Sequence, residues 1–179
     1  MALTEITTWF LEMTSPDLLR PARQPEQMPL LMRAEHPCAE LSRFLYRSVG
    51  GNWYWIDRLV WRYDEWQRWA EQVETWVAYL NGTPAGYFEL EPYRDGTVNI
   101  ALFGLLPWAI GGGLGGWMLT RAVERAWALE PRLVIVNTCS LDGPHALANY
   151  QARGFTIVRT YTGTRMLPDQ SPGPWTPGE

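Results

Sequence analysis

The chain has 179 residues, of which 46% are hydrophobic and 19% charged, and its formal net charge is −4. This composition predicts one globular domain, and the acidic balance argues against a nucleic-acid-binding protein. All 15 basic residues are arginine, which excludes a catalytic or phosphate-binding lysine, and two cysteines with two histidines are too few for a disulfide framework or a typical zinc module.

The N-terminal third is predicted to contain one strand and two helices. Residues 4–14 are rich in β-branched and aromatic side chains, which favours a strand, and four prolines make the segment up to residue 29 irregular. Helix-periodic apolar residues predict helices over 39–48 and 56–73. The N-terminus lacks the basic and apolar regions of a signal peptide, and no run of about 18 apolar residues follows, so we expect a cytoplasmic protein that does not bind membranes.

Three antiparallel strands are predicted next, over residues 76–80, 85–91 and 98–106. Asn81-Gly82 is a strong hairpin signal, because both central positions of a type I′ turn need positive φ, and Asp95-Gly96 marks a second turn. Pro107 ends the third strand.

The C-terminal half alternates helices and strands. After a glycine cluster, apolar residues at every fourth position predict an amphipathic helix over 114–129, and a buried strand over 133–136 follows. A short helix over 144–153 and a strand over 155–161 complete the domain, which we place at residues 1–167. The proline-rich segment 168–179 is expected to be disordered.

The glycine cluster after Pro107 predicts an anion site. A strand, a glycine-rich turn and a helix start bring free backbone amides and the positive end of the helix dipole to one place. Gly111, Gly113 and Gly116 fit the GxGxxG pattern of nicotinamide-binding folds. However, the preceding strands are antiparallel and the next strand ends in Val136-Asn137 without a carboxylate, which disfavours an oxidoreductase. A turn that merely permits tight packing is the other alternative.

Two motifs in this region resemble the GNAT superfamily of acetyl-CoA-dependent N-acetyltransferases. Leu105-Leu106-Pro107 leads into Ile110-Gly111-Gly112-Gly113-Leu114-Gly115, and Tyr150 stands four residues before Gly154-Phe155. The order of predicted elements is similar as well, up to about residue 167. The resemblance implies an α/β fold with a mixed, mostly antiparallel sheet of six to seven strands and about four helices, in which the strands over 98–106 and 133–136 splay apart.

The resemblance also implies where acetyl-CoA would bind. Its pantetheine arm would pair with the strand edge at residues 103–106, and its pyrophosphate would lie on the glycine loop. The implied binding residues are Leu105, Leu106, Ile110, Gly111, Gly112, Gly113, Gly115, Gly116 and Tyr150. Ile110 and Gly112 replace the polar and basic residues usual in the family, so binding would depend on backbone amides. No metal is expected.

The catalytic roles follow from the same resemblance and from the chemistry. The backbone N–H of Leu105 would hold the developing oxyanion, and the Tyr150 hydroxyl would protonate the leaving thiolate. Glu89 and Glu91, two apart on one strand, are the candidates for the base, against the alternative that both are solvated strand residues. Asn99 stands where some relatives place an acid, and an amide cannot act as a base.

Two functions of different classes remain open from the sequence. The first is an N-acetyltransferase that acts on the primary amine of a small molecule or peptide, as a monomer or homodimer. The second is an acyl-CoA-binding sensor or interaction module without turnover. The tryptophans at 53, 55, 61, 66 and 69 fall in the segment that covers the acceptor cleft in the family, where they either pack in the core or contact the acceptor.

Overall fold

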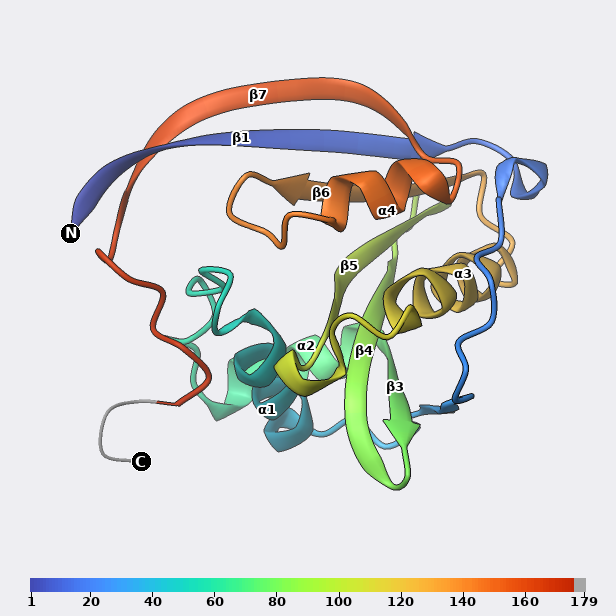
Figure 1. Ribbon diagram of the computed structural model, residues 1–179, viewed down its shortest axis with the longest axis horizontal. Coiled ribbons are helices and arrows are strands. Elements are labelled where there is room, and N and C mark those ends of the chain that lie inside the picture. The colour runs from blue at the N-terminus through green and yellow to red at the C-terminus, as the bar shows by residue number, and fades with distance from the viewer. Residues whose placement is uncertain (176–179) are drawn as a thin grey trace.

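A computed structural model describes residues 1–175, which form a seven-stranded mixed sheet with helices on both faces (Figure 1). In chain order the strands are β1 (Ala2–Met13), β2 (Leu30–Arg33), β3 (Glu74–Leu80), β4 (Thr83–Pro92), β5 (Thr97–Leu105), β6 (Leu133–Cys139) and β7 (Thr156–Leu167). They lie side by side in the order β2-β3-β4-β5-β6-β1-β7, and β5 and β6 form the one parallel pair within this described sheet. The predicted fold class is confirmed.

Each face of the sheet carries two helices. The helices α1 (Ala39–Gly50) and α2 (Tyr63–Gln72) pack on one face, and α3 (Leu114–Trp127) and α4 (Ala146–Ala152) on the other. Successive side chains of a strand point to opposite faces, so Tyr87 packs with α1 while Phe88 packs with α3. No helix in the described part of the chain is long and apolar enough to cross a membrane.

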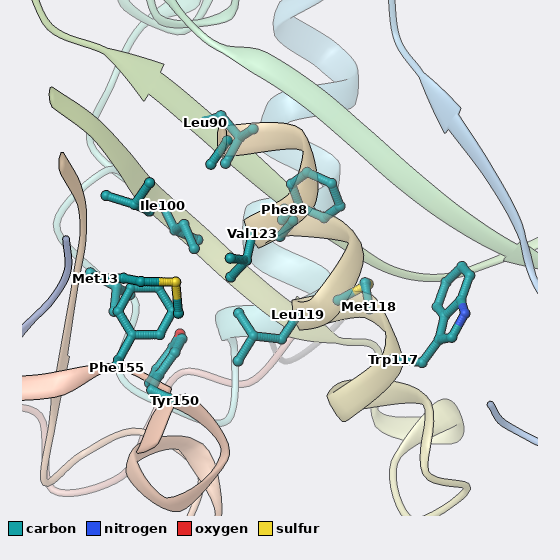
Figure 2. Packing of buried hydrophobic residues seen from close by; sticks show 14 of the residues in the cluster. Met13, Phe88, Leu90, Ile100, Trp117, Met118, Leu119, Val123, Tyr150 and Phe155 are labelled. Atoms are coloured by element: carbon teal, nitrogen blue, oxygen red, sulfur yellow. The ribbon is translucent and has the colours of Figure 1, made fainter. Parts of the chain in front are cut away.

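The larger core lies between the sheet and α3. The predicted every-fourth-residue stripe of this helix is buried throughout, because it faces the strands: Leu114, Met118, Ala122 and Ala126. Figure 2 shows Leu119 and Val123 of α3 in the same core, with Tyr150 and Phe155 at the end of the core nearest α4. This packing fixes the start of α3 and the position of α4 relative to β5.

The first strand, β1, is separated from the antiparallel strands β3, β4 and β5 by β6. β1 is inserted between β6 and β7: its segment Thr8–Met13 pairs with β6, and nearly its whole length pairs with β7 (Figure 1). The edge of the sheet next to β3 is occupied by β2, which pairs with β3. No pattern in the sequence indicated this strand. β2 has four residues and follows a proline-rich segment, so it is stabilised by the free edge of β3 and not by a sequence pattern of its own.

The predicted helix over 56–73 begins at Tyr63 instead. Its start is fixed by a capping box, in which the Arg62 N–H donates to Glu65 at 2.9 Å. Residues 51–62 therefore form a loop of turns. The C-terminal segment packs on this loop, since Gly173 N–H and the Ser171 hydroxyl both donate to the Gly51 carbonyl, at 2.8 and 2.6 Å. Residues 176–179 of the tail predicted to be disordered lie outside the described residues.

A β-bulge in β5 lies just beyond the residues that pair with β6. Glu89 faces Leu102 and Leu90 faces Ile100, so Ala101 is an extra residue without a partner on β4. The parallel pairing of β5 with β6 covers Thr97–Asn99 and ends two residues before the bulge. Because a bulge bends its strand and increases the local twist, β5 diverges from β6 beyond this point. The splayed strands expected from the family resemblance are present.

Candidate active site

A cavity of about 1220 Å³ opens where β5 and β6 separate. Its floor is β5 from Ile100 to Leu105, and its walls are the glycine loop, α4 and the segment 137–146 on one side. The opposite part is lined by α1, residues 53–58 and β7. We call it the acceptor side, because the family resemblance predicts that the tryptophan-rich segment covers the acceptor there. The cavity thus joins the predicted cofactor elements to α1 and the loop that follows it.

The backbone N–H of Leu105 faces the notch between the strands. Leu106 N–H donates to the Ala85 carbonyl at 2.9 Å, so it points toward β4. Successive N–H groups of a strand point to opposite edges, and the Leu105 N–H therefore points away from β4, toward the space that β6 has left. This edge has an unpaired donor of the kind that an extended pantetheine arm or a thioester oxygen would need.

The glycine loop lies at one end of this edge. Gly113 is the N-cap of α3 with φ 75°, and Gly111 has φ 98°, so both adopt conformations that favour glycine. A Cβ added at Gly111, Gly112 or Gly113 would meet nothing within 4 Å, which leaves room for a ligand against the backbone. The predicted residues that line the cavity here are Ile110, Gly111, Gly113, Gly115 and Gly116, whereas Gly112 and Leu106 are not among its lining residues.

Tyr150 lines the cavity from α4. Its ring packs edge-on against Phe103 of β5 and Phe155, with centroids 6.1 Å away in both cases, which fixes the ring beside the notch. Burial, together with the nearby Asp142 carboxylate, raises the pKa of Tyr150 far above its ordinary value. The hydroxyl therefore keeps its proton at every physiological pH, as a proton donor must.

Glu89 and Glu91 lie outside the cavity lining. Glu89 is fully buried beneath α1 and α2, where it accepts hydrogen bonds from Trp69 Nε1, the Thr75 hydroxyl and the Ser42 hydroxyl. Burial raises its pKa, although those donors and the charge of Arg58 oppose the rise.

Glu91 lies two residues further along β4, near the end of the strand, and is partly exposed. It accepts hydrogen bonds from Tyr93 at 3.0 Å and from Asn99 at 3.3 Å. Neither carboxylate touches the notch directly, so a base role for either one requires a relay and stays a prediction.

The tryptophans divide between the core and the cavity. Trp53 and Trp55 line the acceptor side, whereas Trp66 and Trp69 are buried and pack with Trp61. Core packing therefore holds for Trp61, Trp66 and Trp69, while contact with an acceptor stays a prediction for Trp53 and Trp55.

Several cavity residues carry no signal in the sequence. Asp142 accepts hydrogen bonds from Trp55 Nε1 at 3.3 Å and from Thr138 and the Cys139 N–H, and so joins the loop over 51–62 to the end of β6. Arg58 lines the acceptor side as well. The contact between Trp55 and Asp142 joins segments 87 residues apart in the chain, and no local pattern marks it. Within residues 1–175 no group of three or more His, Cys, Asp or Glu side chains is arranged to hold a metal ion.

The chain belongs to the acetyltransferase (GNAT) family, whose model matches residues 33–155. This is the family that the two motifs of the sequence resemble, and its members are acetyltransferases. The match begins at the end of β2, so the inserted strand β1 lies outside it. Among curated proteins, no sequence match to the chain was found.

Solved structures share the fold at low sequence identity. A GCN5-related N-acetyltransferase from Kribbella flavida has a TM-score of 0.61 at 16% identity, over 90% of this chain and 58% of its own. A Bacillus subtilis acetyltransferase in complex with CoA has a TM-score of 0.58 at 21% identity, over 73% of this chain and 78% of its own. A Drosophila protein reaches 0.65 at 13% identity, over 95% and 54%. The chain spans between half and two thirds of the length of the first structures that it matches.

Proposed function

We propose that the protein transfers the acetyl group of acetyl-CoA to a primary amine of a small molecule or peptide, by direct attack of the amine on the thioester. The observation that carries this proposal is the notch, where the Leu105 N–H points away from β4 and Leu105 lines one cavity with Tyr150 and the glycine loop. A hydrogen-bond donor for an oxyanion and a neutral phenol then flank one site. This is the arrangement that acyl transfer from a thioester needs.

The residues divide the chemistry as follows. Acetyl-CoA supplies an activated acyl group when bound. The Leu105 N–H donates to the thioester oxygen and stabilises the negative charge that develops there as the amine attacks. Tyr150 gives its proton to the CoA thiolate as the carbon–sulfur bond breaks, and the new amide forms at the amine nitrogen. The amine proton leaves to a base, for which we propose Glu89 acting through a relay.

A CoA-release assay over a panel of amines tests this function. We expect free thiol to appear only when amine and enzyme are both present, with a matching acetylated product in the mass spectrum. Tight acetyl-CoA binding without product from any amine would instead support the acyl-CoA sensor, which Ile110 in place of the loop arginine and Asn99 in place of an acid favour.

Adding charge to the glycine loop should strengthen CoA binding. We expect Gly112→Arg to lower the Kd of CoA about fivefold at low salt, because a guanidinium beside the pyrophosphate contributes about 1 kcal/mol in an exposed site. Nothing lies within 4 Å of a Cβ at this position, so the fold should tolerate the change. Calorimetry gives the Kd, and the gain should disappear in 0.5 M salt. Gly112→Gln is the uncharged control, and an equal gain from it would contradict the electrostatic explanation.

Glu89→Gln should separate the base role from a structural role. We expect kcat/KM to fall about tenfold and the acidic limb of its pH profile to disappear, because burial places the pKa of Glu89 above its ordinary value and closer to neutral pH. The free energy of unfolding of Glu89→Gln should instead rise relative to that of the wild type. A carboxyl whose pKa is raised by folding stabilises the protein below its unfolded pKa, and this contribution is lost as the pH rises through the folded pKa. Urea unfolding should therefore show a relative gain for Glu89→Gln that grows with pH. Glu91→Gln is the control, and an equal loss of activity in it would contradict the assignment.

A further inference from the structure

Arg58 presents a rigid cation on the acceptor side of the cavity. Its guanidinium carbon lies 3.7 Å from the ring centroid of Trp69, 4.7 Å from that of Trp61 and 5.8 Å from that of Tyr46. The Arg58 backbone N–H also donates to the Tyr46 hydroxyl, at 3.4 Å. Rings on several sides restrict the side chain to one orientation, so little conformational entropy remains to be lost when a ligand binds.

The carboxylates around Arg58 are bound to other groups. Asp57 forms an ion pair with Arg165, and Asp142 is held by three donors at the end of β6. Glu89 is held by its own three donors, and in residues 1–175 no carboxylate oxygen lies within 4.0 Å of the Arg58 guanidinium. Arg58 therefore interacts with Glu89 by charge alone, without a hydrogen bond or a close ion pair.

One nitrogen of the guanidinium also lacks a hydrogen-bond partner. Its Nη1 atom is buried and has no hydrogen-bond partner among the described residues. A buried donor without a partner costs free energy, so such atoms are rare in folded proteins and commonly mark a missing water or ligand. The side chain lines the cavity, and a planar fork of N–H donors matches the two oxygens of a carboxylate.

We infer that Arg58 anchors a carboxylate carried by the acceptor, so that the substrate class is amino acids and other amines with an acid group. This inference rests on the proposed function, since it names the acceptor for that same site. A carboxylate fits better than a phosphate dianion, because the other arginine in the lining, Arg165, is already neutralised by Asp57. The acceptor would then lie among Trp53, Trp55 and Tyr161, with its amine toward Leu105 and its acid toward Arg58.

A binding experiment tests the anchor without requiring turnover. With CoA bound, 3-phenylpropionate should raise the melting temperature of the wild-type protein, whereas 3-phenylpropionamide, its uncharged match, should not. Arg58→Met keeps the apolar stem of the side chain and should weaken carboxylate binding by at least about tenfold. Arg58→Lys keeps the charge but not the fork and should retain part of the binding. Arg121→Met, on the outer face of α3, should bind as the wild type does.

A kinetic experiment tests the substrate class. Glycine, phenylalanine and γ-aminobutyrate are each compared with the corresponding carboxamide. We expect kcat/KM to favour the best acid over its amide by about 10- to 100-fold, and Arg58→Met should reduce this ratio to about one while the KM for acetyl-CoA stays unchanged. A purely structural role for Arg58 would lower both rates equally and leave the ratio intact.

The two proposals fail in different ways. Amides that react as well as acids in the wild type would overturn the carboxylate anchor and leave the acetyltransferase standing. No CoA release from any amine, combined with carboxylate binding that depends on Arg58, would support the anchor and overturn the catalytic proposal. Equal binding of the acid and the amide would overturn the anchor whatever the turnover.

Discussion

Replacing Tyr150 with phenylalanine should lower kcat about 100-fold, at the low end of the range for a general acid. The Phe variant keeps the ring that packs between Phe103 and Phe155, so the core and the notch should not change. What is lost is the proton for the leaving thiolate, whose own pKa near about 8.5 makes it a moderate leaving group without help. Single-turnover measurement of CoA release isolates this step from product dissociation.

CoA binding provides the control for this variant. We expect the Kd of CoA to change less than about twofold in Tyr150→Phe, because the phosphates and the pantetheine arm would bind to backbone groups. The substitution should slow transfer from a thioester of a basic thiol more than transfer from a thioester of an acidic thiol, since the need to protonate the leaving thiolate rises with the thiol pKa. Equal losses with both leaving groups would show that Tyr150 acts by positioning and not as the acid.

Local patterns in the sequence were sufficient to predict most elements. Asn81 and Gly82 adopt φ values of 50° and 81°, as the predicted tight turn requires, and Gly96 has φ 82° at the second turn. The stripe on α3 is buried as its spacing indicates. These features depend on residues within a few positions of one another, so a short window of sequence contains the relevant information.

The choice of strand partners is a different matter. The composition of residues 4–14 predicts a strand, but nothing in it indicates that the partners are β6 and β7. Such pairing depends on which edges are free once the rest of the sheet has formed. The same reason explains β2, whose four residues form a strand only against the edge of β3.

The candidate site divides in the same way. The glycine loop and Tyr150, which line the cavity, could be predicted as site residues because each belongs to a motif of neighbouring residues. Glu89 and Glu91 both lie on β4, two residues apart. Their environments differ because Trp69 of α2 donates to the buried Glu89, whereas Glu91 is partly exposed and accepts from Tyr93 and Asn99. Arg58 was missed because its aromatic neighbours come from two helices and a loop. Burial and charge pairing are properties of packing, and a single sequence does not record them.

Gly154, which follows α4, should be among the least replaceable residues of the chain. Its φ is 106°, and an added Cβ would lie 2.0 Å from the Leu18 carbonyl oxygen. The backbone strain and the clash each cost about 1–3 kcal/mol, so we expect Gly154→Ala to lower the free energy of unfolding by about 3–5 kcal/mol. Urea unfolding followed by tryptophan fluorescence measures this loss.

A matched glycine separates the two contributions. Gly96 also has a positive φ, 82°, but its added Cβ would lie 3.5 Å from the nearest atom, on the flexible Arg132 side chain. Gly96→Ala should therefore cost only the conformational strain, about 1–2 kcal/mol. The excess loss in Gly154→Ala then measures how tightly residues 16–19 press on the end of α4. Because Phe155 N–H donates to the Tyr150 carbonyl at 3.2 Å, relief of that clash would shift the tyrosine, and kcat should fall further than the loss of folded protein explains. Equal destabilisation of the two alanine variants would show that the contact with Leu18 yields at little cost, and that the glycine is required for its backbone conformation alone.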